Sequence, residues 1–361
     1  MTAPPVPTAP TATAPATATA GPRRADPLGA VLDDRRTLLR RALTEAVDRL
    51  GADIRTVVSY HLGWTDLDGR PVAGDSGKGL RGCLALLGAE AFAGAPEPGL
   101  PGAVAVELVH NFSLLHDDII DLDRERRHRP TAWTVFGVGP TIVAGDALLT
   151  LAADVVLAAG GAAAADAAEL LLSATRAMIE GQAVDLSYQV RRDIPMADVV
   201  AMSEQKTGAL IGCGAAIGAV LAGADRPSWG ALREFGTRLG VAFQAVDDIL
   251  GTWGDPSVTG KDVGGDLRRR KLTLPLAAAL GHAGEAGAEL RALMAATTDL
   301  EPWYVQRAAI LVEACGGREW TERHAKEQFE SALAALERTG VSGEPRELLH
   351  AIAAFSVGRA Y

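Results

Sequence analysis

The chain has 361 residues, of which 48% are hydrophobic and only 5% aromatic, so it can bury a large core built mostly from Ala, Leu and Val. Its formal net charge of -10 argues against a surface that neutralises nucleic-acid phosphates. Cys83, Cys213 and Cys315 lack metal-ligand spacing and favour buried thiols over zinc ligands or disulfides. With no secretory signal and no apolar run of about eighteen residues, we expect a cytoplasmic protein without a transmembrane segment.

Residues 1–27 consist almost entirely of Pro, Ala and Thr and contain little that could be buried. Such a segment cannot offset its ordering entropy, so we expect a disordered arm. It is either an inert tail or a recruitment segment that binds a partner.

The rest of the chain is predicted to be helical. Apolar residues recur every three or four positions over 28–62, and strand-like alternation is scarce. Turn signals such as "GAPEPGLPG" and "GADRPS" separate further Ala/Leu-rich segments, which lie near 80–94, 101–122, 138–160, 163–189, 196–222, 228–252, 272–298 and, in pieces, 303–361. The expected fold is all-α, with helices around a central cavity.

The stretch "HDDIIDLDRERRHR" begins at residue 116 and crowds acids and arginines at the end of an apolar segment. Helical spacing places Asp117 and Asp121 one turn apart on one face, with Asp118 beside them. Neighbouring carboxylates repel, and Mg²⁺ is a natural counterion because it accepts a few carboxylates and keeps positions for phosphate oxygens. The alternative is a solvated acidic face paired with the following arginines.

A second acidic pair, Asp247 and Asp248, lies near the end of another apolar segment and is followed by a Gly-rich loop with Lys261. Two such helix ends facing each other could hold several Mg²⁺ ions. Only five of the 35 basic residues are lysines. Four of these lysines lie at loop or helix boundaries suited to phosphate, namely Lys78, Lys206, Lys261 and Lys271.

With these residues the chain resembles the trans-isoprenyl diphosphate synthases of the polyprenyl synthetase family, over roughly residues 75–275 and again in the closing segment "HAIAAFSVGRAY". "HDDIID" with "RRHRPT" resembles the first aspartate-rich motif. "AGDALL", "GQAVDL", "KTGAL" and "FQAVDDILGTWGDPSVTGK" follow in the family's order.

The resemblance implies an isoprenoid synthase fold, an antiparallel helical barrel, with residues 28–361 as the catalytic domain of a homodimer. It implies head-to-tail condensation of isopentenyl diphosphate with an allylic diphosphate (DMAPP, GPP or FPP). Ionising the allylic C–O bond releases a polyanion that Mg²⁺, Lys and Arg stabilise, while an apolar pocket protects the carbocation.

The resemblance also implies roles for single residues. Asp117 and Asp121 would bind two Mg²⁺ ions and Asp247 a third, with Asp118 and Asp248 close by. The allylic diphosphate would be held by Arg126, Lys206, Gln244 and Lys261, with Lys206 and Thr207 beside the developing cation. Isopentenyl diphosphate would be held by Lys78, Arg81, His110 and Arg127.

The chain departs from the family pattern at several positions. Gly251 stands where the second motif usually has a third aspartate, which predicts altered metal handling without loss of activity. Gly79 replaces Arg and Gly82 replaces Pro in "SGKGLRG", and His128 and Arg270 each replace Gly. These changes affect the expected loop geometry.

Product length depends on the helix before Asp117. Ser113 is one turn earlier and small enough to let a prenyl tail pass. Phe112 resembles the aromatic floor of geranylgeranyl-chain members, although it could equally be ordinary core. The favoured product is geranylgeranyl diphosphate (C20), and farnesyl diphosphate (C15) is the alternative.

Three other readings stay open. The substitutions allow a weakly active subunit that regulates a partner synthase. A terpene cyclase or head-to-head synthase is disfavoured, because the residues of an isopentenyl site are present. The Pro/Ala/Thr-rich arm resembles, in composition only, extensions that direct enzymes into encapsulin-type protein shells.

Overall fold

The computed structural model describes residues 27–72, 79–188, 191, 194–254, 264–295 and 302–358. These residues are mostly helical, which confirms the expected all-α fold. The helices are α1 (Pro27–Val47), α2 (Ala52–His61), α3 (Leu80–Ala93), η1 (Glu97–Gly99), α4 (Leu100–Ile120), α5 (Ala132–Phe136), α6 (Val138–Leu157), α7 (Gly161–Tyr188), α8 (Met196–Ser203), η2 (Glu204–Gly208), α9 (Ala209–Leu221), α10 (Arg226–Trp253), α12 (Gly265–Arg268), α13 (Leu274–Leu280), α14 (Glu285–Ala295), α15 (Pro302–Ala314), α16 (Gly317–Glu337) and α17 (Gly343–Val357). A short antiparallel hairpin joins β1 (Glu125–Arg126) to β2 (Arg129–Pro130).

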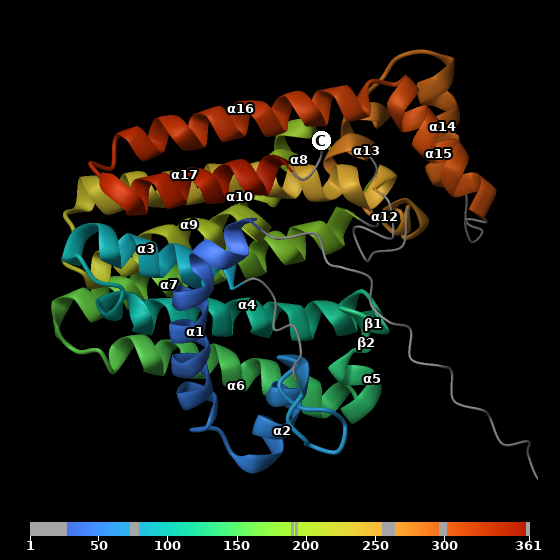
Figure 1. Cartoon of the computed structure of the whole chain (residues 1–361). Helices are drawn as coiled ribbons and strands as arrows, with labels where there is room; N and C mark the ends of the chain where they lie inside the picture. Colours follow the sequence, from blue (N-terminus) through green and yellow to red (C-terminus); the bar gives the residue numbers. More distant parts are fainter. Residues whose placement is uncertain are drawn as a thin grey trace, which may run out of the picture.

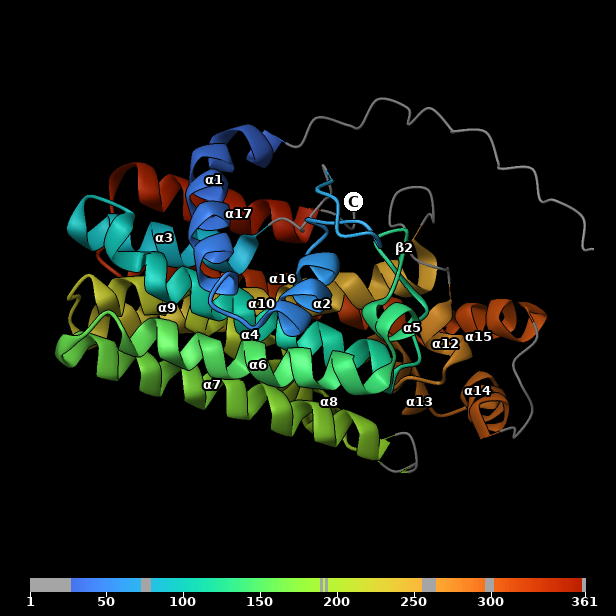
Figure 2. The same ribbon diagram turned by 90° about the horizontal axis from the view of Figure 1, so that it is seen from below.

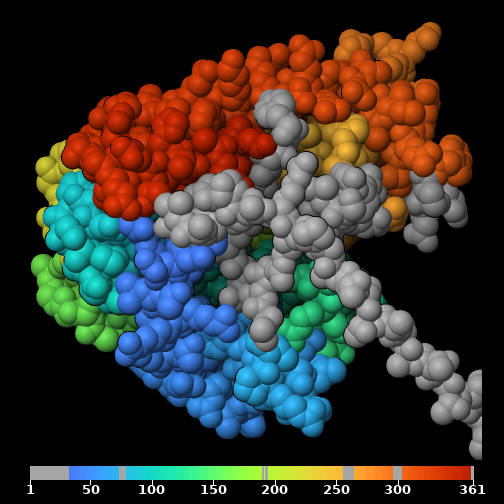
Figure 3. Space-filling view, viewed as in Figure 1, coloured from blue at the N-terminus to red at the C-terminus, as the bar shows by residue number. Residues whose placement is uncertain are grey.

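The long helices lie side by side in layers, as Figure 1 shows. α10 packs against both α16 and α9, α9 packs against α3, and α4 packs against α6. α16 forms the upper edge in Figure 1, α6 and α7 run along the lower side of the bundle in Figure 2, and α1 crosses the bundle (Figures 1 and 2). The space-filling view in the same orientation shows α1 directly below α17 on this face, where the two helices are in contact (Figure 3).

Small residues let the central helices approach closely. A Cβ atom at Gly218 of α9 would lie only 1.7 Å from the carbonyl oxygen of Ala85 in α3. A Cβ atom at Gly88 of α3 would in turn lie 2.9 Å from the carbonyl oxygen of Ala215. The low aromatic content is therefore a packing feature, since backbone contacts fill space that large side chains would otherwise occupy.

The three cysteines are buried free thiols, as the sequence predicted. Burial raises the pKa of Cys83 and of Cys213 to about 12, so neither thiol is a ready nucleophile at neutral pH. They serve as small core residues.

Two predicted helices are divided in the structure. The segment 28–62 breaks at Gly51, the N-cap of α2. The segment 196–222 is interrupted by η2, a π-helical turn that contains Lys206 and Thr207. π-Turns inside helices often coincide with functional sites, and this one places two predicted substrate-binding residues on an irregular backbone.

One helix within the described parts of the chain, α6, is long and apolar enough to cross a membrane. The sequence analysis expected no such segment. α6 packs against α4 and α7, and Ala144, Leu148 and Ala152 are buried there. These contacts are those of a bundle helix.

Candidate functional site

The first acidic cluster lies at the C-terminal end of α4. Asp121 is the C-cap residue, and its backbone N–H donates to the carbonyl of Asp117 one turn earlier. Burial raises the pKa of Asp117 and the nearby charge of Asp121 raises it further, while Lys206 opposes the shift. The predicted pairing of these two carboxylates at one helix end is therefore present.

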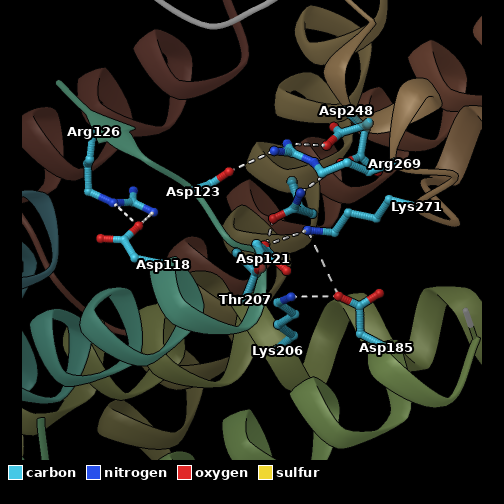
Figure 4. A network of polar contacts seen from close by, with 12 residues as sticks. Asp118, Asp121, Asp123, Arg126, Asp185, Lys206, Thr207, Asp248, Arg269 and Lys271 are labelled. Atoms are coloured by element: carbon cyan, nitrogen blue, oxygen red, sulfur yellow. Dashed lines mark hydrogen bonds and ion pairs between the residues drawn. The ribbon is translucent and has the colours of Figure 1, made fainter. Parts of the chain in front are cut away.

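Asp118 points to a different partner. Its side chain is only 1% exposed. Its Oδ1 accepts a hydrogen bond from Nε of Arg126 at 2.8 Å and lies 2.7 Å from Nη2 of the same guanidinium group. Arg126 is on strand β1, so the pair fixes the hairpin to α4. Arg126, predicted to hold the allylic diphosphate, thus forms an ion pair with Asp118 (Figure 4).

The second acidic cluster lies near the C-terminal end of α10. Asp248 is buried, and its carboxylate accepts from Nε2 of Gln244 at 2.7 Å and from the backbone N–H of Leu274 at 2.9 Å. Burial raises the pKa of Asp248 to about 7 against these two hydrogen bonds. Asp248 was predicted to lie close to the metal ions. In the structure it links α10 to the start of α13. Asp247 is the less buried carboxylate of the pair.

The π-turn supplies the next two predicted residues. Nζ of Lys206 lies 2.6 Å from Oδ2 of Asp185 on α7, and Oγ1 of Thr207 donates to Oε1 of Gln244 at 2.8 Å. A Cβ atom at Gly181 would lie 2.6 Å from the backbone nitrogen of Lys206. The glycine of "GQAVDL" thus allows α7 to pack directly under this turn.

Two cations between α12 and α13 lie among the acidic side chains. Lys271 was identified from sequence as a lysine suited to phosphate, whereas Arg269 was given no role. Nζ of Lys271 lies 3.8 Å from Oδ2 of Asp121 and 4.0 Å from Oδ2 of Asp185. Arg269 donates to Asp123, after α4, at 2.7 Å. Figure 4 shows these side chains converging from α4, α7 and the α12–α13 segment. The scarcity of lysine was the sequence signal that pointed to Lys271.

A further group of basic residues, around His110, lies near Arg126. The pKa of His110 is lowered by burial and then by the charges of Arg81, Arg127 and Arg126. Nε of Arg81 is buried without a hydrogen-bond partner. Three of the four residues predicted to hold isopentenyl diphosphate, Arg81, His110 and Arg127, are thus brought into one electrostatic neighbourhood.

His61 at the end of α2 belongs to the same region and was missed from sequence. Its pKa is lowered to about 3 by burial and by the charges of Arg126, Arg127 and Arg129. His61 and these three arginines line one small cavity. Because His61 lies outside every motif quoted above, only its burial and surroundings identify it.

The remaining predicted residues divide into two groups. Lys78 and Lys261 lie outside the described residues, so their roles stay predictions. Phe112 is 7% exposed within the core, and its ring meets that of His116 edge to face at 4.9 Å. Ser113 is half-buried, and its hydroxyl donates to the carbonyl of His110 at 2.8 Å.

The aspartates of the site are suited to divalent cations that are bound jointly by the protein and by a phosphate-containing ligand. Across the described residues, no three His, Cys, Asp or Glu side chains converge tightly enough to hold a metal by themselves. Asp117 and Asp121 nevertheless form a partly desolvated pair whose repulsion a cation would relieve. Mg²⁺ commonly takes one or two carboxylates and completes its shell with phosphate oxygens and water. Asp117, Asp121 and Asp247 are the side chains suited to such ions.

Comparison with known proteins agrees with this geometry. The family model described as "Polyprenyl synthetase" matches residues 70–306. A (2E,6E)-farnesyl diphosphate synthase of Mycobacterium tuberculosis is 42% identical over 325 residues, covering 89% of this chain and 90% of that protein. A geranylgeranyl diphosphate synthase of the same species is also 42% identical, over 308 residues that cover 85% of this chain and 88% of that protein.

Among solved structures, a polyprenyl synthetase from Streptomyces coelicolor A3(2) superposes with a TM-score of 0.86 at 46% identity, covering 91% of this chain and 99% of that one. A geranylgeranyl pyrophosphate synthase from Corynebacterium glutamicum, complexed with isoprenyl diphosphate and magnesium, superposes with a TM-score of 0.78 at 29% identity, covering 91% and 99%.

Proposed function

The chain belongs to the polyprenyl synthetase family, and from this premise we propose that it is an Mg²⁺-dependent prenyltransferase. It joins isopentenyl diphosphate head to tail with the allylic diphosphates DMAPP, GPP and FPP. Its product is a short-chain prenyl diphosphate, for which we favour geranylgeranyl diphosphate. The relatives named farnesyl and geranylgeranyl diphosphate synthase support this class of reaction.

The observation that carries this proposal is the gathering of acidic side chains from three helices around two lysines. Lys271 contacts Asp121 of α4 and Asp185 of α7 and interacts electrostatically with Asp248 of α10, while Lys206 contacts Asp185. These lysines surround the carboxylates at the place where a diphosphate with its metals would enter. The Arg81, His110 and Arg127 region lies beside it, as a second diphosphate substrate requires.

The residues act through charge and the exclusion of water. When bound, Mg²⁺ would neutralise the charge that develops on the departing diphosphate. Lys206 and Lys271 would exchange carboxylate partners for phosphate oxygens, and Thr207, held by Gln244, lies on the π-turn beside Lys206. Apolar side chains of the surrounding helices would leave the allylic cation without a competing nucleophile.

The product length is the finer part of the proposal. Farnesyl and geranylgeranyl synthases match this chain at the same identity, so the relatives do not distinguish C15 from C20. Phe112 supports C20 because its large ring is on α4, five residues before the first aspartate. Its burial and edge-to-face contact with His116 give it a fixed orientation there.

A turnover assay tests the proposal. Purified protein is given Mg²⁺, labelled isopentenyl diphosphate and each allylic primer in turn, and the products are separated by chain length. We expect turnover that requires Mg²⁺ and stops at C20. Turnover only after addition of a second synthase would instead identify a regulatory subunit, and absence of incorporation under both conditions would contradict the proposal.

We further propose that the enzyme is a homodimer that pairs through α6 and α7. Leu172, Ile179 and Leu186 recur every seven residues along α7 and are exposed, as are Ile142 and Val143 of α6. The two helices pack against each other along one side of the bundle (Figure 2). An apolar surface of this kind is typical of an interface between subunits.

The N-terminal arm, residues 1–27, lies almost wholly outside the described residues, which begin at residue 27. We propose that it recruits the enzyme to a partner, such as an encapsulin-type shell in the cytoplasm. Deleting residues 1–27 would then leave turnover intact and abolish co-purification with the shell protein. Equal co-purification after the deletion would exclude this role.

A further inference from the structure

The second aspartate motif of this chain ends in a glycine, and the space beside that glycine is filled. Gly251 is buried near the C-terminal end of α10. A Cβ atom at this position would lie 2.8 Å from Oδ2 of Asp266, which is on α12. A side chain at position 251 and the present position of the Asp266 carboxylate therefore exclude each other.

The backbone around Asp266 holds its side chain at this place. The N–H of Gly264 donates to the carbonyl of Gly251 at 3.0 Å, which fixes α12 against α10. The N–H of Lys271 donates to the carbonyl of Asp266 at 2.9 Å. These two bonds anchor both sides of the short helix that carries Asp266.

Charges from both acidic helix ends also act on this carboxylate. The second guanidinium nitrogen of Arg269 lies 3.4 Å from Oδ1 of Asp266, while its first contacts Asp123 beyond α4 at 2.7 Å. Asp266 also acts electrostatically on Lys271 and on Asp248. Its side chain is 22% exposed, so it remains accessible to water and small ions.

We propose that Asp266 replaces the third carboxylate that the second motif lacks, so that α12 and not α10 supplies the acid beside position 251. Asp266 is then a positioning residue, which orders the water and cation shell next to Asp247 and bears on metal affinity. This inference rests on the proposed function, because it takes the ligand to be a diphosphate with its divalent cations.

The test moves the carboxylate back to α10. Wild type, Asp266→Asn, Asp266→Ala and the exchange variant Gly251→Asp/Asp266→Ala are each titrated with Mg²⁺ at fixed inorganic pyrophosphate. The midpoint of the rise in melting temperature reports metal-dependent binding without turnover. We expect Asp266→Asn and Asp266→Ala to raise the Mg²⁺ midpoint about tenfold, as loss of an outer ligand-orienting group typically does. The exchange variant should recover most of that loss.

Two controls keep the result interpretable. Asp166→Asn removes an exposed acid of α7 and should titrate like wild type. Melting temperatures without Mg²⁺ show whether each variant folds, and Asp266→Asn is nearly isosteric, so it answers the question even if the exchange variant does not fold.

The two possible failures are distinguishable. A wild-type protein that pyrophosphate and Mg²⁺ do not stabilise would contradict the proposed function itself. If wild type is stabilised but Asp266→Asn has an unchanged midpoint, only the role of Asp266 is overturned. A folded exchange variant that recovers nothing would overturn the spatial replacement.

Discussion

The hairpin that carries Arg126 reverses direction through Arg127 and His128, whose φ angles are 53° and 59°. Two consecutive residues with positive φ form the tight turn that usually contains glycine at its second position. The sequence analysis noted His128 where the family has glycine, and the structure shows that the backbone nevertheless keeps the left-handed conformation. This turn carries Arg127 and follows Arg126, two arginines that the sequence predicted to bind substrate.

Replacing His128 by Gly should therefore stabilise the protein. The left-handed conformation costs a non-glycine residue about 1–2 kcal/mol, and the greater freedom of glycine in the unfolded chain returns part of that gain. We expect a net increase of about 0.5 kcal/mol in the free energy of unfolding. Chemical denaturation measures it, and a loss of stability would show that the His128 side chain makes a contribution larger than the strain.

His61 should make stability depend on pH. Its pKa is lowered to about 3 in the folded protein, so the unfolded chain binds the extra proton first as the pH falls from about 6.5, its ordinary value. The stability contributed by neutral His61 is thus present above pH 6.5 and is lost between about 6.5 and 3, by up to ~1.4 kcal/mol per pH unit. The His61→Gln variant should lose less stability than wild type over this range. Parallel curves for the two proteins would contradict the assignment.

Phe112 gives a prediction about the product. Replacing it by Ala removes a buried ring from α4 and should extend the chain beyond C20 if the ring forms the floor of the prenyl cavity. Leu115→Ala is a matched control, since it also truncates a buried side chain of α4. Mass spectrometry measures the chain length of the products. If Phe112→Ala gives products of unchanged length, Phe112 is an ordinary core residue and not the floor of the prenyl cavity.

At the scale of single residues, the sequence predicted which residues belong to the site better than it predicted their contacts. The spacing of Asp117 and Asp121 and the rarity of lysine identified groups that the structure does bring together. The ion pair of Asp118 with Arg126 joins a helix to a hairpin, and the bridge from Arg269 to Asp123 joins residues that are 146 positions apart in the chain. No local pattern encodes such partners, because they are set by how α4, α10 and the hairpin pack.

Between elements, glycines allow α3 and α9 to approach each other closely. Gly88 and Gly218 bring these two backbones into contact, and α3 begins at the position next to Arg81. A Cβ atom at Gly214 of α9 would lie 3.0 Å from the carbonyl oxygen of Arg81, so the same packing reaches the start of α3, where this predicted substrate residue lies. The sequence predicted α3 with nearly correct ends, but it predicted α8, η2 and α9 as one segment, because the π-turn before α9 depends on packing against α7 and α10.

A methyl group at Gly218 should push these helices apart. The Cβ of Gly218→Ala would lie 1.7 Å from the carbonyl oxygen of Ala85, so either the backbone moves or α3 tilts. We expect destabilisation by about 3 kcal/mol, as for severe overpacking. Gly230→Ala in α10 meets no atom within 4 Å and should instead stabilise by about 1 kcal/mol through helix propensity. Equal melting temperatures for the two variants would contradict the packing argument.

At the scale of the whole molecule, the exposed apolar side chains of α6 and α7 predict a dimer. A charged side chain introduced into this interface should dissociate the dimer. Val143 is 52% exposed, and Val143→Lys would place a cation in the proposed interface. Ile310→Lys is a matched control, because Ile310 is 57% exposed on α15, away from α6. Light scattering should show a monomer for the first variant and a dimer for the second. A wild-type monomer would contradict the proposal.

In the proposed reaction, the acidic ends of α4 and α10 hold one diphosphate between them through shared divalent cations. Crystals of the protein with Mn²⁺ in place of Mg²⁺ and a non-reactive allylic diphosphate analogue would locate the ions by anomalous scattering. We expect the ions to join the diphosphate to Asp117 and Asp121 on one side and to Asp247 on the other, with Lys206 on the phosphate oxygens. Ions and analogue bound elsewhere, or a diphosphate held by one helix end alone, would contradict the account.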